Sequence, residues 1–176
     1  LQMQAGAVGV CVQKTSEAQA LAARGVRNIF ISNEVIDARK LARIATLARE
    51  ATLAIAVDSA LGIERLADAV RAAGASIDVF VEIDVGHGRC GCAPHDTAAL
   101  ARQAIDRGLR FAGLQAYHGR AQHLRGVAER RAAIEAATQA VHSAQAALAA
   151  VGIVCPLVTG AGSGSFVLEA ESGVWG

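Results

Sequence analysis

Short apolar runs alternate with longer amphipathic segments along the whole sequence. The apolar runs predict six β strands, at residues 6–13, 28–33, 52–58, 77–84, 109–117 and 154–160. The segments between them predict five helices, at residues 16–24, 37–50, 63–73, 96–107 and 123–150. Each strand run is rich in Val and Ile or continuously apolar, as strands covered on both faces are. This alternation predicts βα units and a parallel sheet.

Two α/β architectures fit this alternation, an open doubly wound sheet and a closed (β/α)8 barrel. A barrel needs eight strands and usually about 200 residues or more, whereas this chain of 176 residues offers six strands. Strand spacing alone therefore favours the barrel only slightly. The sequence opens without a start methionine or a secretory signal and stops in a strand-like run. We interpret both ends as cuts within a longer protein.

Composition narrows the classes of function. The formal net charge is +1, which gives no general attraction for nucleic acid or an acidic membrane surface. The sequence lacks an uninterrupted apolar stretch of about 18 residues, the length typical of a membrane span. Four cysteines do not suggest a disulfide framework in a chain of this size. We therefore expect a cytoplasmic protein that binds neither nucleic acid nor a membrane.

Polar and glycine residues gather where the predicted strands end, the side on which ligands bind in both architectures. The segment from Val81 to Gly91 passes from a strand into a glycine-punctuated loop that projects Arg89. A guanidinium is permanently charged and donates several hydrogen bonds to an anionic oxygen. The alternative is a structural ion pair of Arg89 with Asp84 or Glu82.

Two other strand ends carry candidate binding residues. The segment of residues 157–165 is glycine-rich, and successive backbone N–H groups in such a turn form a concave anion site. A flexible turn is the alternative, because motifs of this kind also occur by chance. Tyr117 is the only tyrosine in the chain and ends a predicted strand. Its ring can stack on a planar ligand or simply pack at the rim of the fold.

One rival site involves a metal ion. His87, Cys90, Cys92 and His95 are spaced by three, two and three residues, which a tetrahedral zinc site can use. Ligand identity without geometry is weak support for such a site. We therefore assign no metal ligand to this chain.

Five segments resemble, in this order along the chain, the D-threonine aldolases and the related D-threo-3-hydroxyaspartate and D-serine dehydratases. They are GVCVQK (residues 9–14), ISNEV (31–35), VEIDVGHGRCG (81–91), GLQAYHG (113–119) and TGAGSG (159–164). These are pyridoxal phosphate (PLP) enzymes built on a barrel like the N-terminal barrel of alanine racemase. The resemblance spans essentially the whole chain. It implies a (β/α)8 TIM-type barrel of PLP fold type III, with about six of the eight strands in residues 1–176 as a partial PLP-binding domain.

The resemblance also implies roles for individual residues. The implied cofactor-binding residues are Gln13, Arg89, Tyr117, Thr159, Gly162, Ser163 and Gly164. Arg89 would contact the 3-oxygen of PLP, Tyr117 would lie against the ring, and the glycine-rich loop would hold the phosphate. His118 is a candidate catalytic residue near the substrate. Ala161 replaces a glycine that is usual in the family, which should still permit the turn.

Other parts that the resemblance implies fall outside the sequence. The Schiff-base lysine would precede Leu1 on a first strand, and Lys14 and Lys40 are not credible substitutes for it. A divalent metal ion such as Mn or Mg would be bound by a C-terminal β domain that follows Gly176. The whole protein would thus be a PLP enzyme of which this chain is the central part of the barrel.

The activity implied by the resemblance is that of a lyase. It would cleave a D-3-hydroxy amino acid by a retro-aldol reaction to glycine and an aldehyde, so its partner is a small molecule. One alternative is a D-threo-3-hydroxyaspartate or D-serine dehydratase, and another is a PLP-binding protein without catalysis. The resemblance also allows a homodimer.

Overall fold

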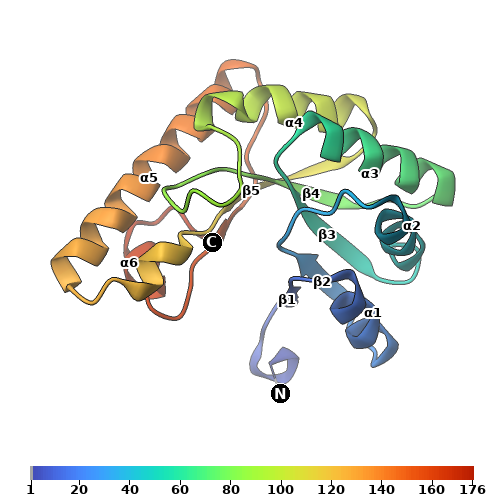
Figure 1. The fold of residues 1–176 in the computed structure, drawn as a ribbon, viewed down its shortest axis with the longest axis horizontal. Coiled ribbons are helices and arrows are strands. Elements are labelled where there is room, and N and C mark those ends of the chain that lie inside the picture. Colours follow the sequence, from blue (N-terminus) through green and yellow to red (C-terminus); the bar gives the residue numbers. More distant parts are fainter. Residues whose placement is uncertain (1) are drawn as a thin grey trace. The chain divides into compact units, whose positions relative to one another are not determined.

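The computed structural model describes residues 2–176, which form two compact units (Figure 1). The first unit runs as far as Phe80 and includes Gln103–Phe111, and the second consists of Val81–Arg102 and Ala112–Gly176. Six strands follow one another in the sheet in chain order. Two of them, β4 (Asp78–Glu82) and β5 (Arg110–Ala116), have residues in both units.

The first unit alternates strands and helices in the order expected for βα units. After a short 3-10 helix, η1 (Met3–Ala5), its elements are β1 (Val10–Val12), α1 (Thr15–Ala23), β2 (Asn28–Ile31), α2 (Ala38–Leu47), β3 (Thr52–Val57) and α3 (Ala60–Ala73). The strands pair in parallel, with Val12 opposite Ile31 and Ile31 opposite Ile55. Each helix therefore serves as a crossover between parallel neighbours.

Side chains at the helix ends explain where the helices of the first unit begin. Oδ1 of Asp37 accepts a hydrogen bond from the Lys40 N–H at 3.0 Å, and Oγ of Ser59 accepts one from the Gly62 N–H at 3.3 Å. Both are N-cap contacts that satisfy donors left open at a helix start. Gly74, with a φ of 59°, ends α3 in the left-handed conformation, which glycine adopts without steric cost.

The core of the first unit is aliphatic. The largest fully buried side chains of this unit are Ile29, Ile31, Leu41, Ile44, Leu53, Ile55, Ile63, Leu66 and Ile77. Apart from Ile77, which precedes β4, they come from the strands and from α2 and α3, two helices that contact each other. One aromatic pair, Phe30 and Phe80, adds a tilted ring contact with centroids 5.0 Å apart.

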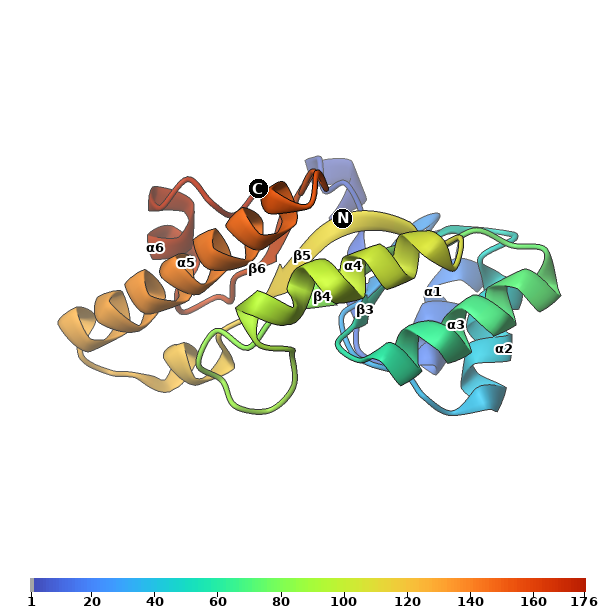
Figure 2. The ribbon, with the colours of Figure 1, turned by 90° about the horizontal axis from the view of Figure 1, so that it is seen from above.

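The second unit holds the carboxyl ends of β4 and β5 and most of the chain after them. Its other elements are η2 (Pro94–Asp96), the first part of α4 (Thr97–Asp106), η3 (Gly119–His123), α5 (Val127–Ala150), β6 (Val158–Gly160) and α6 (Phe166–Glu171). β5 and β6 pair in parallel, with Gln115 opposite Thr159. The short helix α6 lies beside the long helix α5, as Figures 1 and 2 show.

One stripe of α5 supplies much of the core of the second unit. Its buried residues are Ile134, Ala137, Val141, Ala144 and Leu148. Their spacing of three and four residues places them on one face of the helix. α5 contacts η2, η3 and α6.

No helix in the described part of the chain is both long and apolar enough to cross a bilayer.

The predicted elements are largely confirmed, and the differences are local. The predicted strands at residues 6–13 and 154–160 shorten to the three-residue strands β1 and β6. The predicted helix at residues 123–150 begins later, because His123 closes η3. The predicted helix at residues 96–107 is preceded by a 3-10 turn that starts at Pro94. Helix α6 was not predicted, since six residues are too few to show helical periodicity.

Candidate functional site

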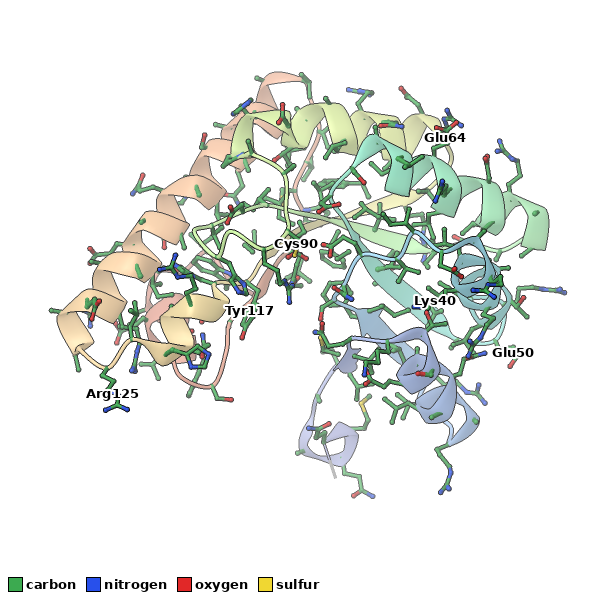
Figure 3. All side chains as sticks on the ribbon, in the orientation of Figure 1. Lys40, Glu50, Glu64, Cys90, Tyr117 and Arg125 are labelled. Carbon is green, nitrogen blue, oxygen red and sulfur yellow. The ribbon has the colours of Figure 1, made fainter. Side chains whose placement is uncertain are left out.

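Three loops of the second unit follow the carboxyl ends of neighbouring strands. The Ile83 N–H, just after β4, donates to the Gln115 carbonyl oxygen of β5 at 3.0 Å, and Gln115 in turn pairs with Thr159 of β6. The loops after β4, β5 and β6 therefore lie along one edge of this unit. Figure 3 labels a side chain from each of the first two, Cys90 and Tyr117. This is the edge at which ligands bind in α/β folds.

The carboxylate of Asp84 shapes the loop after β4. Its Oδ1 accepts hydrogen bonds from the N–H groups of Gly86 at 2.9 Å and Gly88 at 3.0 Å. Burial alone would raise the pKa of Asp84, but the N–H groups of Gly88, Gly86 and His87 hold it below its ordinary value. The carboxylate therefore remains charged, and it organises the turn.

Arg89 lies in this loop among a thiol and a carboxylate. Its Nε and Nη2 donate to Sγ of Cys90 at 3.2 and 3.1 Å, and that thiol donates to Oε1 of Glu82 at 2.9 Å. Arg89 and Glu82 also form an ion pair at 3.7 Å, with side-chain exposures of 46% and 5%. The ion pair predicted as an alternative thus exists with Glu82. Nearly half of the Arg89 side chain still faces solvent.

Tyr117 follows β5 and contacts a histidine from the neighbouring loop. The rings of Tyr117 and His87 meet edge to face, with centroids 6.1 Å apart. His87 also lies directly over Gly119, where a Cβ would come within 2.4 Å of the imidazole. The loops after β4 and β5 therefore pack on each other through Tyr117 and His87.

The adjacent His118 is buried, with only 7% of its surface exposed. Its Nδ1 has no hydrogen-bond partner in the described part of the chain, and its Nε2 faces Gly86, at 3.1 Å from the position of an added Cβ. Burial, followed by the positive charges of His87 and Arg120, holds the pKa of His118 below 6.5. The imidazole is therefore neutral near pH 7, and one ring nitrogen is left without a partner.

The glycine-rich loop after β6 wraps around a glutamine. The Gly164 N–H donates to Oε1 of Gln122 at 2.7 Å, and a Cβ at Gly162 would lie 2.5 Å from the same side chain. Ser163 between them is exposed, and among the described residues no hydrogen bond engages its N–H or hydroxyl. Ala161 adopts a φ of 65°, so the turn forms with alanine at this position, at some backbone strain.

Two predicted site residues, Thr159 and Gln13, form side-chain hydrogen bonds within the fold. Oγ1 of Thr159 contacts Oε1 of Gln115 at 2.5 Å and the Leu114 carbonyl oxygen at 3.3 Å, which ties β6 to β5. Gln13 lies in the first unit, where its Nε2 donates to Oγ of Ser32 at 2.8 Å. The structure therefore gathers the predicted residues of the second unit at one edge and gives no placement of Gln13 among them.

Sequence reasoning missed a buried carboxyl beneath the glycine-rich loop. Glu169 of α6 is fully buried, and its Oε2 accepts a hydrogen bond from Oγ of Ser165 at 2.9 Å. Burial raises the pKa of Glu169 above its ordinary value, partly offset by the Ser165 hydroxyl and the Gly162 N–H. A serine followed four residues later by a glutamate was the only sequence signal for this contact.

The four residues of the rival zinc site have separate surroundings in the described part of the chain. These four candidate ligands have different partners: Cys90 bonds Glu82, Cys92 lies 3.9 Å from the Thr97 hydroxyl, His95 pairs with Asp96, and His87 packs on Tyr117. In the described residues these four do not gather as a set of metal ligands.

Comparison with known proteins places this arrangement in a family. The model of the family described as "Alanine racemase, N-terminal domain" matches residues 1–174. The chain is 46% identical over 176 residues to a D-threonine aldolase of Arthrobacter sp., covering 99% of this chain and 46% of that protein. It is 38% identical over 173 residues to a 3-hydroxy-D-aspartate aldolase of Paracoccus denitrificans, covering 97% and 45%.

A solved structure agrees with these matches. The crystal structure of D-threonine aldolase from Filomicrobium marinum superposes with a TM-score of 0.96 at 46% identity, covering 99% of this chain and 48% of that one. The chain thus spans about half the length of the relatives it matches. The superposition confirms the predicted fold class, six parallel strands of a barrel with its crossover helices. The chain belongs to the alanine racemase N-terminal domain family.

Proposed function

We propose that this chain is the cofactor-binding part of a PLP-dependent aldolase. The enzyme would cleave a D-3-hydroxy amino acid between its α and β carbons to give glycine and an aldehyde. The observation that carries the proposal is the convergence of three strand-end loops in the second unit, bearing Arg89, Tyr117 and Ser163. Two relatives whose names describe aldolases of D-hydroxy amino acids support the reaction type.

The residues of the second unit fit the chemical groups of PLP. Ser163 is exposed and offers an N–H and a hydroxyl to the phosphate. The glycines on either side of it have no Cβ, which leaves space for the Gln122 side chain. The Tyr117 ring offers a face to the pyridine ring, and the Arg89 guanidinium offers donors to the ring oxygen. When bound, PLP supplies an electron sink for cleavage of a bond at the α carbon.

The proton transfers of the reaction need a side chain that is unprotonated near pH 7 and lies close to Tyr117, the residue proposed to contact the PLP ring. His118 follows Tyr117 directly, and its depressed pKa keeps the imidazole able to accept a proton. The unpartnered Nδ1 is the atom that would do so. We assign the lysine that carries the cofactor and the ligands of a divalent metal ion to parts of the protein beyond this chain.

A product assay tests the proposal. The protein that carries this chain is purified, supplied with PLP and Mn²⁺, and given D-threonine or D-threo-3-hydroxyaspartate. We expect glycine and an aldehyde in equal amounts, together with cofactor absorbance in the visible range. Ammonia and a 2-oxo acid would instead show a dehydratase. Cofactor absorbance without turnover of either substrate would show a PLP-binding protein without this activity.

A further inference from the structure

A chain of hydrogen bonds runs beneath the glycine-rich loop. The Gly164 N–H donates to Oε1 of Gln122 at 2.7 Å, and Nε2 of the same amide lies 2.5 Å from Oγ of Ser165. Oγ of Ser165 lies 2.9 Å from Oε2 of Glu169. Four residues from η3, the loop and α6 are therefore connected, all within the second unit.

The direction of each bond in this chain follows from the donors available. A backbone N–H can only donate, so the amide oxygen of Gln122 must face Gly164 and its NH₂ must face Ser165. The Ser165 oxygen accepts from that NH₂, which leaves its proton to donate to Glu169. Each donor in this series of hydrogen bonds therefore points towards the buried carboxyl of Glu169. The Gln122 amide supplies both an acceptor for the Gly164 N–H and a donor for Oγ of Ser165.

The two glycines fit the glutamine closely. A Cβ at Gly162 would lie 2.5 Å from Cδ and Oε1 of Gln122, and one at Gly164 would lie 3.0 Å from Oε1. The glycine pattern therefore has a cause besides phosphate binding, since it lets the loop close over the amide. The inner side of the loop is occupied by the Gln122 side chain, whereas Ser163, between the two glycines, is exposed.

We propose that Gln122, anchored through Ser165 on Glu169, is a positioning residue that holds the glycine-rich loop as a preformed cradle in which Ser163 is the donor to a phosphate monoester. This inference rests on the proposed function, because the phosphate is that of PLP. Gln122 lies in η3, five residues after Tyr117, so the same amide ties the phosphate cradle to the segment that carries the ring contact. A preformed site binds more tightly because less ordering accompanies binding.

Two ligands that differ only in the phosphate separate this role from general stability. In the cofactor-free protein that carries this chain, the affinities for PLP and for pyridoxal are measured by spectroscopic titration. We expect Gln122→Ala to weaken PLP binding about tenfold, the effect of one lost hydrogen bond of about 1.4 kcal/mol, and to leave pyridoxal binding unchanged. Gln139→Ala, an exposed glutamine on α5, is the matched control and should change neither affinity.

Further variants test the direction of the hydrogen bonds. Gln122→Glu keeps the acceptor for Gly164 but loses the donor to Ser165 and adds a negative charge, so PLP affinity should fall further than in Gln122→Ala. Glu169→Gln keeps an oxygen that can accept from Ser165, so it should retain most of the affinity. Gln122→Asn is too short to reach both partners and should repeat the selective loss if the alanine variant folds poorly.

The outcomes distinguish failure of this inference from failure of the proposed function. If the unchanged protein binds PLP no more tightly than pyridoxal, the phosphate site and with it the proposed function are wrong. If the unchanged protein prefers PLP and Gln122→Ala keeps that preference, the positioning role is wrong. An equal loss of affinity for PLP and pyridoxal would likewise overturn the positioning role, because the glycine-rich loop should contact only the phosphate.

Discussion

The guanidinium of Arg89 lies against the thiol of its neighbour Cys90, with Nε and Nη2 at 3.2 and 3.1 Å from Sγ. The thiol proton points to Oε1 of Glu82, so the cation is held by a sulfur that is itself fixed by a buried carboxylate. A guanidinium presents its donors in a rigid fork. Because Nε and Nη2 are fixed on the Cys90 thiol, the orientation of the whole Arg89 guanidinium is fixed as well.

Replacing Arg89 by alanine tests its place in the cofactor site. Because a hydrogen bond to a charged group contributes about 1.5–3 kcal/mol, Arg89→Ala should weaken PLP binding about tenfold or more in the protein that carries this chain. Arg125→Ala is a matched control, since Arg125 is exposed and points away from the unit (Figure 3). Unchanged cofactor affinity in Arg89→Ala, measured by absorbance titration, would show that Arg89 has a structural role in its loop and does not bind the cofactor.

The buried residues of α5 are expected to contribute strongly to the free energy of unfolding. Leu148 is fully buried, so Leu148→Ala removes apolar contacts and leaves a cavity, at a cost of about 2–5 kcal/mol in the free energy of unfolding. Val127→Ala, at the exposed start of the same helix, should cost less than about 0.5 kcal/mol. Chemical denaturation compares the two variants. Equal losses would mean that α5 does not pack through these buried residues.

Arginines next to α6 do not neutralise Glu169. Arg130 of α5 donates to the carbonyl oxygens of Leu124 and Gly164, and Arg131 pairs with Glu171. The carboxyl is therefore buried without a close cation of α5, and burial raises its pKa. This arrangement has a consequence for stability as a function of pH.

A raised pKa means that the folded protein binds the Glu169 proton more tightly than the unfolded chain does. The resulting stabilisation is complete below the ordinary value of 4.5 and is lost as the pH rises through the folded-state pKa. The wild type should therefore lose stability relative to Glu169→Gln as the pH rises above 4.5. Asp84 has a lowered pKa, so Asp84→Asn should show the opposite trend below 3.8. Chemical denaturation between pH 3 and 8 measures the free energy of unfolding of both variants. Parallel pH curves for wild type and Glu169→Gln would refute the prediction for Glu169.

Local chemistry explains how much of the fold was predictable. Strand β3 and the end of helix α3 carry their signals in the sequence, because burial selects Val, Ile and Leu and Gly74 ends the helix. The start of α3 was predicted at residue 63, whereas the Ser59 cap places it at Ala60. Strand β6 was predicted, but at residues 154–160, because the apolar run extends beyond the three residues that pair with β5. Helix α6 has six residues, too few for a periodic signal, and it packs on α5.

The candidate site was predictable only for residues whose type suggests chemistry. Arg89, Tyr117 and Ser163 stood out because a lone cation, a lone tyrosine and a glycine-rich turn follow predicted strands. Gln122 did not stand out, since a glutamine in an irregular segment has no pattern of its own. Its proposed role depends on a hydrogen bond to Gly164, 42 residues away along the chain, which no local sequence pattern reveals.

His118 combines burial with an unused ring nitrogen, and this makes a kinetic prediction. The group is 7% exposed and its Nδ1 lacks a partner in the described residues. If His118 accepts a proton in the reaction, His118→Asn should lower kcat about a hundredfold or more, the usual range for general acid–base catalysis, and leave PLP affinity unchanged. His142→Asn, an exposed histidine of α5, should alter neither.

The pH profile distinguishes this role of His118 from a purely structural one. Because burial, together with His87 and Arg120, lowers the pKa of His118, the neutral imidazole persists below pH 6.5. The acidic limb of kcat in the unchanged enzyme should therefore lie below 6.5, and His118→Asn should abolish that limb. A limb that survives in the variant would show that another group titrates. A fall in kcat that follows a fall in melting temperature, with the limb intact, would show that His118 only fills the core beside Gly86.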